Sequence, residues 1–102
     1  MASGKDMTMK KDIQISREKR VTFTHTSADA NEVMLAGDFN NWDYKSSPMR
    51  KVKPNLWKRD MSLKAGRYEY KFVVDGNWML DPSNSNTVRN PLGVENSVIE
   101  VI

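Results

Sequence analysis

The chain has 102 residues, which is the size of one domain with a single core and leaves little room for a deep catalytic cleft. It contains no cysteine, so neither disulfides nor thiolate metal sites hold the fold. The net charge of +3 comes from basic residues interrupted by acidic ones, a spread typical of a solvated surface. No apolar run approaches the roughly 20 residues that a membrane span needs. We therefore expect neither a nucleic-acid nor a membrane partner.

The first residues differ in composition from the rest of the chain. Residues 1–14 are polar and basic and lack the apolar stretch of a secretory signal. We interpret 1–14 as a flexible basic tail and 15–102 as one folded domain. The absence of cysteine is compatible with a reducing compartment, and we expect a cytoplasmic protein. Whether the domain stands alone or belongs to a larger protein stays open.

Short stretches with strand character follow one another from residue 19 onward. The predicted strands are residues 19–26, 32–36, 49–52, 57–63 and 66–74, a returning strand through Trp78, and a closing strand over 98–102. Turn formers separate them, and residues 81–93 are predicted to form an irregular loop. No stretch keeps the helical period for three turns. The sequence therefore predicts an all-β fold, an immunoglobulin-like β-sandwich of about seven short antiparallel strands.

The clearest local signal is a β-hairpin. Residues 66–74 alternate large aromatic residues on one face with polar residues such as Lys71 on the other. Asp75-Gly76 follows as a two-residue turn that tolerates positive φ, and it fixes the register so that Val73 pairs with Trp78. Trp78 then shares an outward, solvated face with Lys71. A large exposed indole beside a cation indicates a binding platform.

The other two tryptophans have different interpretations. Trp57 alternates with Met61 and Leu63, which favours a place in the core. Trp42 follows a tight turn, and from the residues alone it could either close one end of the sandwich or supply a second exposed ring. Lys71 without the neighbouring indole would be an ordinary solvated lysine.

No arrangement of residues indicates catalysis. His25 is the only histidine and has no serine or cysteine partner at a recognisable spacing, so we expect a histidine at the surface or half-buried at a strand end. The aspartates that could pair for acid–base chemistry all lie in turns, where Asp has a structural role: Asp38, Asp43, Asp75 and Asp81. Residues 38–43 offer oxygens for calcium but do not fit the EF-hand pattern. We expect no enzyme activity, no cofactor and no metal site.

A sugar-binding platform accounts for the remaining features. The C–H face of a glucose ring packs on an indole, while its hydroxyls need donors and acceptors at the rim. Trp78 and Lys71 supply a ring and a donor. Trp42, flanked by Asn40 and Asn41, could supply a second ring.

Four motifs in order resemble the family forty-eight carbohydrate-binding modules, which include the glycogen-binding domain of AMP-activated protein kinase beta subunits and domains that precede the barrel of isoamylases and branching enzymes. The motifs are Gly37-Asp38-Phe39-Asn40-Asn41-Trp42, residues 66–78, Asp81-Pro82 and Leu92-Gly93-Val94-Glu95-Asn96, and the resemblance covers about residues 19–102. It implies an early-set immunoglobulin-like sandwich that binds α-1,4-glucans.

The resemblance also implies roles for individual residues. Trp42 and Trp78 correspond to the two indoles that stack on glucose, and Lys71 corresponds to a lysine that bonds sugar hydroxyls. Leu92 corresponds to a leucine that reaches into the curve of the glucan, and Asn96 to an asparagine that bonds a hydroxyl. One position differs: the kinase-type loop has a threonine where this chain has Val94, so one hydroxyl contact is lost, a contact worth about 0.5–1.5 kcal/mol.

The leading hypothesis is therefore a non-catalytic module that binds glycogen, starch or maltooligosaccharides, and the charged surface favours a monomer. Two alternatives stay open. The aromatic face could dock a protein partner, although such a face is usually larger and more apolar. The domain could also be an accessory to a glucan-processing enzyme or kinase assembly and position that neighbour without binding sugar itself.

Overall fold

The computed structural model describes residues 18–102, and the tail predicted over 1–14 lies outside this range. The described chain forms eight strands and two single turns of 3-10 helix. In chain order these are β1 (Glu18–Thr26), β2 (Val33–Gly37), η1 (Asp38–Asn40), η2 (Tyr44–Ser46), β3 (Arg50–Lys53), β4 (Leu56–Lys64), β5 (Gly66–Val74), β6 (Asn77–Met79), β7 (Thr87–Arg89) and β8 (Glu95–Val101). The predicted all-β class is confirmed.

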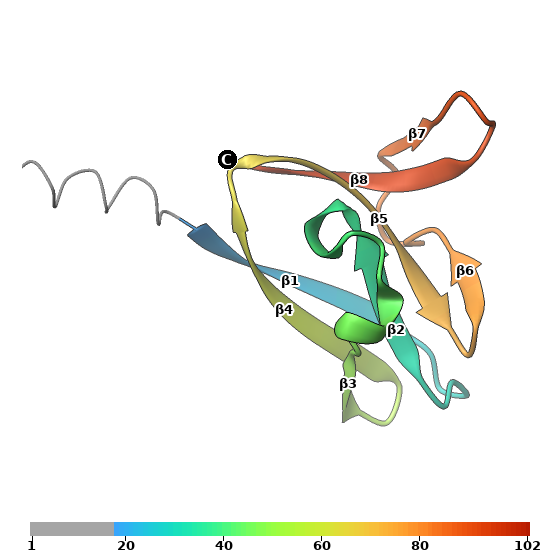
Figure 1. Ribbon diagram of the computed structural model, residues 1–102. Coiled ribbons are helices and arrows are strands. Elements are labelled where there is room, and N and C mark those ends of the chain that lie inside the picture. The colour runs from blue at the N-terminus through green and yellow to red at the C-terminus, as the bar shows by residue number, and fades with distance from the viewer. Residues whose placement is uncertain (1–17) are drawn as a thin grey trace, which may run out of the picture.

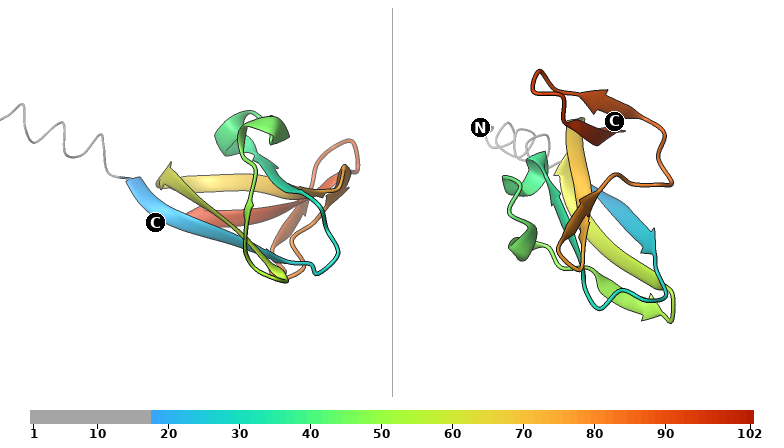
Figure 2. Two further views of the ribbon diagram at one scale, coloured as in Figure 1. Left: turned by 90° about the horizontal axis from the view of Figure 1, so that it is seen from below. Right: turned by 90° about the vertical axis from the view of Figure 1, so that its right-hand side faces the viewer.

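The strands make two antiparallel sheets that face each other across one core. The smaller sheet has the order β1-β4-β3, and the larger has the order β2-β5-β8-β7 with β6 added along β5. Figure 1 shows η1 and η2 beside β2, and β6 together with the β7–β8 end on the other side of β5. The right-hand view of Figure 2 shows β5 running between these two groups. β5 is therefore the central strand of the outer surface of the larger sheet, with η1 and η2 on one side and β6, β7 and β8 on the other.

The core comes from the alternation that the sequence shows. Phe23 of β1 and Tyr70 of β5 meet edge to face with ring centroids 5.0 Å apart. Leu35 and Phe72 are fully buried, and Trp57 is buried as predicted. Because alternate residues of β5 point inward, their neighbours Glu69 and Lys71 are left on the outer face of the larger sheet.

The predicted hairpin forms with the predicted register. Asp75 and Gly76 have φ of 48° and 84°, the positive values that a two-residue turn of this kind needs, and Val73 pairs with Trp78. The Asp75 carboxylate also accepts hydrogen bonds from the backbone N–H groups of Asn31 and Glu32 at 2.9 Å. The turn thus fixes both the returning strand and the segment that leads into β2.

Three expectations need correction. Thr87–Arg89 is a strand, β7, inside the stretch expected to be loop, because it pairs with β8 from Thr87↔Ser97 to Arg89↔Glu95. His25 is 6% exposed and not at the surface, since its ring packs 5.0 Å from that of Phe72. Val73, expected on a solvated face, is 2% exposed.

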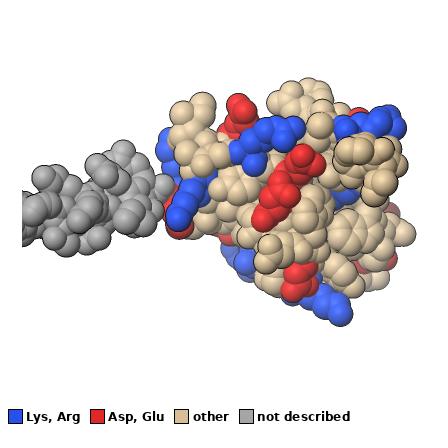
Figure 3. Space-filling view, turned by 45° about the horizontal axis from the view of Figure 1, so that its top comes forward, with Lys and Arg blue, Asp and Glu red and all other residues tan. Residues whose placement is uncertain are grey.

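The surface carries charges of both signs. Basic and acidic side chains are interspersed on the face shown in Figure 3. Within residues 18–102 the structure contains no helix with the length and apolarity that a membrane crossing requires.

Candidate functional site

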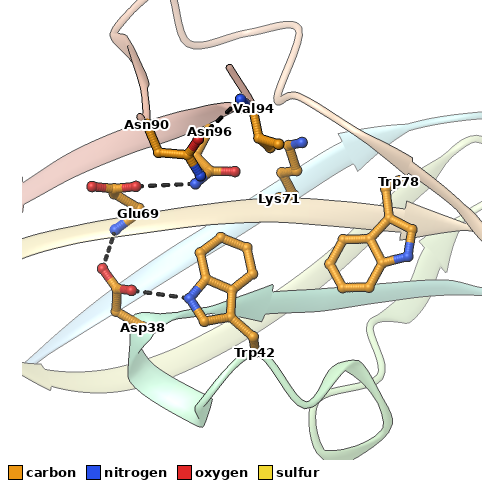
Figure 4. A pocket seen from close by; sticks show the side chains of 8 residues that line it. All are labelled: Asp38, Trp42, Glu69, Lys71, Trp78, Asn90, Val94 and Asn96. Carbon is orange, nitrogen blue, oxygen red and sulfur yellow. Dashed lines mark hydrogen bonds between the residues drawn. The ribbon is translucent and has the colours of Figure 1, made fainter. Parts of the chain in front are cut away.

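An open groove of about 500 Å³ lies on the outer face of the larger sheet. Its walls come from segments far apart in the sequence: Asp38, Trp42, Glu69, Lys71, Trp78, Asn90, Val94 and Asn96. Figure 4 shows these side chains above β5, with the two indoles on one side and the asparagines and Val94 on the other. Four of the five predicted site residues line this groove, and Leu92 does not.

The two tryptophans form an aromatic pair at one end. Trp78 projects from β6, and Trp42 projects from the turn after η1. Their ring centroids are 6.5 Å apart and their planes are inclined by 31°. Trp78 is 47% exposed, and the ring of Tyr44 packs against it at 5.8 Å with an interplanar angle of 80°. Trp42, whose place the residues alone left open, is half-buried and lies beside Trp78 at the groove.

The backbone at Asn41 and Trp42 has a strained, left-handed conformation. Asn41 and Trp42 both have left-handed backbones, with φ of 56° and 60°. This region costs an L-residue roughly 1–2 kcal/mol, and such residues cluster at ligand-binding sites. Two hydrogen bonds close the turn. The backbone N–H of Trp42 donates to the Gly37 carbonyl at 2.9 Å, and the Asn40 side-chain oxygen accepts from the Gly37 backbone N–H at 3.0 Å.

Glycine is required at position 37 because the backbone of β5 lies too close to leave room for a side chain. A Cβ at this position would lie 2.6 Å from the Glu69 carbonyl oxygen and 2.8 Å from the Tyr70 Cβ. The absence of a side chain lets the end of β2 lie tightly against β5, which sets the position from which the turn to Trp42 starts.

The polar rim comes from β5, β8 and the turn after β2. Asn96 of β8 is only 7% exposed, and its side-chain N–H donates to Glu69 Oε1 at 3.0 Å. The Asp38 carboxylate accepts from the Trp42 indole N–H at 3.0 Å and from the Glu69 backbone N–H at 2.8 Å. Lys71 lies on the same face of β5 as Glu69, two residues further on.

The loop between β7 and β8 borders the groove. The Asn90 side-chain oxygen accepts from the N–H groups of Leu92 at 2.9 Å and Val94 at 3.0 Å, and Gly93 has φ of 87°. These bonds hold a tight turn with the Leu92 side chain at its tip, 88% exposed. Val94 faces the groove, so an apolar wall stands where the resemblance implied a hydroxyl.

Sequence reasoning missed three lining residues. Glu69 could have been found because it shares the outward face with Lys71 by simple alternation. Asp38 was assigned to a turn and weighed only for acid–base chemistry and as a calcium ligand, and Asn90 was assigned to a loop. Nothing in the local pattern indicates that their side chains reach the groove.

The groove therefore combines an apolar side of two inclined indoles with a few fixed polar groups, an arrangement suited to binding sugar rings. Among residues 18–102, no group of three or more histidine, aspartate or glutamate side chains is placed to hold a metal ion. Fold and groove together define the class: a β-sandwich module that binds ligands on its surface. A family model described as the glycogen recognition site of AMP-activated protein kinase matches residues 19–102, and the chain belongs to this family.

The relatives similar to this chain include beta subunits of the same kinase. The human 5'-AMP-activated protein kinase subunit beta-2 is 36% identical over 89 residues, which are 87% of this chain and 32% of that subunit. The pig subunit beta-1 is 36% identical over 86 residues, 84% of this chain and 67% of the relative. Most of these relatives are longer, and the chain spans about a third of the beta-2 subunits.

Among solved structures, a maltogenic amylase from S. marinus superposes with a TM-score of 0.71 at 22% identity, over 84% of this chain and 14% of the amylase. At this identity the likeness shows a shared fold.

Proposed function

We propose that this domain binds α-1,4-glucans such as glycogen, starch and maltooligosaccharides without acting on them. The observation that carries the proposal is the pair of indoles 6.5 Å apart and inclined by 31°. An inclined pair suits two successive glucose units of a curved α-linked chain better than the flat ribbon of a β-linked one. Membership of the glycogen-recognition family supports the same ligand.

Within this proposal each predicted residue has a role. Trp42 and Trp78 stack on the glucose rings, and the Lys71 ammonium donates to hydroxyls at the rim. Asn96 keeps its side-chain oxygen for a sugar hydroxyl, because its amide N–H is already used on Glu69. Leu92, exposed at the tip of the β7–β8 loop, contacts the glucan from the other side.

The affinity should be modest. An open groove recovers little beyond the entropy lost on association, and we expect dissociation constants between micromolar and millimolar. The role is that of a non-catalytic module. Because the relatives are subunits of a kinase, we include a protein partner in the proposal. A monomeric state of the domain and a cytoplasmic location remain predictions.

Electrophoresis in gels that contain glycogen tests the proposal. The wild-type protein should be retarded relative to a gel without glycogen, and Trp78→Ala should migrate equally in both. Val52→Ala is the matched control, because Val52 is a comparably exposed apolar residue on β3 of the other sheet. Equal retardation of the wild type and a folded Trp78→Ala variant would contradict the assignment of the site.

A further inference from the structure

Asp38 has an arrangement that the sugar-binding roles do not use. One carboxylate oxygen accepts from the Trp42 indole N–H at 3.0 Å, and the other accepts from the Glu69 backbone N–H at 2.8 Å. Both oxygens therefore have a protein donor. Asp38 joins a stacking residue on one side of the groove to the central strand beneath it (Figure 4).

The first of these bonds restrains an indole that would otherwise rotate. Trp42 sits on a left-handed backbone in an exposed turn, where the main chain alone does not fix the side-chain torsions. With its N–H tied to Asp38, the ring presents a face to the groove in one orientation, inclined by 31° to Trp78. By contrast, the indole N–H of Trp78 makes no hydrogen bond with any residue in the range 18–102.

The second bond connects the two sides of the groove. The Glu69 backbone N–H donates to Asp38, and the Glu69 carboxylate accepts from Asn96 at 3.0 Å and from Arg67 at 3.3 Å. A continuous path of hydrogen bonds thus runs from Trp42 through Asp38 and Glu69 to Asn96. Glu69 of β5 is the link that joins the η1 turn, with its stacking ring, to the polar group of β8 on the opposite side.

We propose that Asp38 is a positioning residue that sets the orientation of Trp42 and thereby the affinity for glucan, without itself contacting the sugar. The inference rests on the proposed function and explains why a carboxylate is needed. Both partners of Asp38 are N–H donors, and an asparagine side chain has one acceptor oxygen and one NH₂ group, which can only donate. Asp38→Asn therefore places two donors face to face at one of the two contacts. A ring already fixed before binding loses less freedom when the sugar arrives, which raises affinity.

The test uses two-dimensional ¹H–¹⁵N NMR, in which the three indole N–H groups of Trp42, Trp57 and Trp78 give separate signals. In the wild-type protein without sugar, the Trp42 indole hydrogen should exchange with solvent more slowly than that of Trp78. In Asp38→Asn the Trp42 signal should shift and exchange faster, while the Trp57 signal, which reports on the core, stays in place. Affinity for maltoheptaose should fall about three- to tenfold, the effect of one lost orienting contact.

Asp60→Asn is the matched control. Asp60 is also exposed and also accepts a hydrogen bond, from the Thr22 hydroxyl at 2.7 Å, but it lies on β4 of the other sheet. The control removes the same charge and should leave both the indole signals and the affinity unchanged.

Two results would overturn the inference: a wild-type Trp42 indole that exchanges as fast as that of Trp78, or a folded Asp38→Asn variant with undiminished affinity. The first needs no variant, so it holds even if Asp38→Asn does not fold. Failure of the wild-type protein to bind maltoheptaose would instead refute the proposed function, and the indole exchange would still report whether Asp38 holds Trp42.

Discussion

Replacing Trp42 by glycine should give a more stable protein than replacing it by alanine. At most positions the order is the reverse, because glycine loses more backbone freedom on folding, at a cost of roughly 0.5–1 kcal/mol relative to alanine. At φ of 60° a Cβ costs roughly 1–2 kcal/mol, and glycine avoids this strain. Both variants lose the same indole contacts, so the difference isolates the backbone. At the centre of these two ranges Trp42→Gly is ahead by about 0.75 kcal/mol.

Thermal unfolding followed by circular dichroism measures this difference. For a domain of this size the advantage corresponds to a Tm of Trp42→Gly about 2–8 °C above that of Trp42→Ala. Thr24, exposed in the middle of β1, supplies the matched pair, and there Thr24→Ala should be more stable than Thr24→Gly. An alanine variant at position 42 that is at least as stable as the glycine variant would refute the argument that the backbone is strained to present the ring.

Three further predictions concern the packing within the sandwich. Gly37→Ala should lower the free energy of unfolding by about 1–3 kcal/mol, because the alanine Cβ would collide with the Glu69 carbonyl oxygen 2.6 Å away. Urea unfolding measures the loss, and a midpoint equal to that of the wild type would contradict the close packing of β2 against β5. Burial lowers the pKa of His25 below 6.5 although Asp81 opposes the shift, so the unfolded chain binds a proton that the folded chain does not. The free energy of unfolding should therefore fall as the pH drops through about 6.5 toward the folded-state pKa, and urea unfolding at about pH 7.5 and pH 5 should show a smaller loss in His25→Gln; an equal loss would exclude His25 as the cause. Tyr70→Phe should lower the free energy of unfolding by about 1–3 kcal/mol, because the Tyr70 hydroxyl donates to Asp81 at 2.7 Å and its removal leaves a part-buried carboxylate without that donor. A Tm equal to that of the wild type would show that water replaces the hydroxyl.

Much of the scaffold could be predicted because its signals are local. Alternation along residues 66–74 determines which side chains of β5 enter the core, and Asp75-Gly76 determines the register that brings Trp78 opposite Val73. These features depend on neighbours in sequence, so they can be read without knowledge of the rest of the fold.

The parts that could not be predicted depend on contacts between distant segments. The turn between β2 and β3 is placed by backbone bonds such as Leu35 N–H to the Ser47 carbonyl at 3.0 Å, and no periodicity in the sequence encodes this return along β2. That return decides the position of Trp42, which the residues alone left open. β7 has three residues, too few to show alternation, and it exists through its pairing with β8.

The same reason applies to the polar groups of the groove. Asp38 reads as an ordinary turn residue, since aspartate is common in turns. Its reach to the Glu69 backbone spans 31 positions of sequence, and the bond from Asn96 to Glu69 spans 27. Alternation and the turn place Trp78 and Lys71 on one face in advance, and the resemblance adds Trp42, whereas the hydrogen bonds around them could not be predicted.

The most direct test of the central claim is titration of the intrinsic tryptophan fluorescence with maltoheptaose and with cellohexaose. The account predicts a saturable change with the α-linked sugar only, and no change in a folded Trp42→Ala/Trp78→Ala variant that retains the buried Trp57. An equal response to the β-linked sugar, or a flat titration with maltoheptaose to about 10 mM, would contradict it.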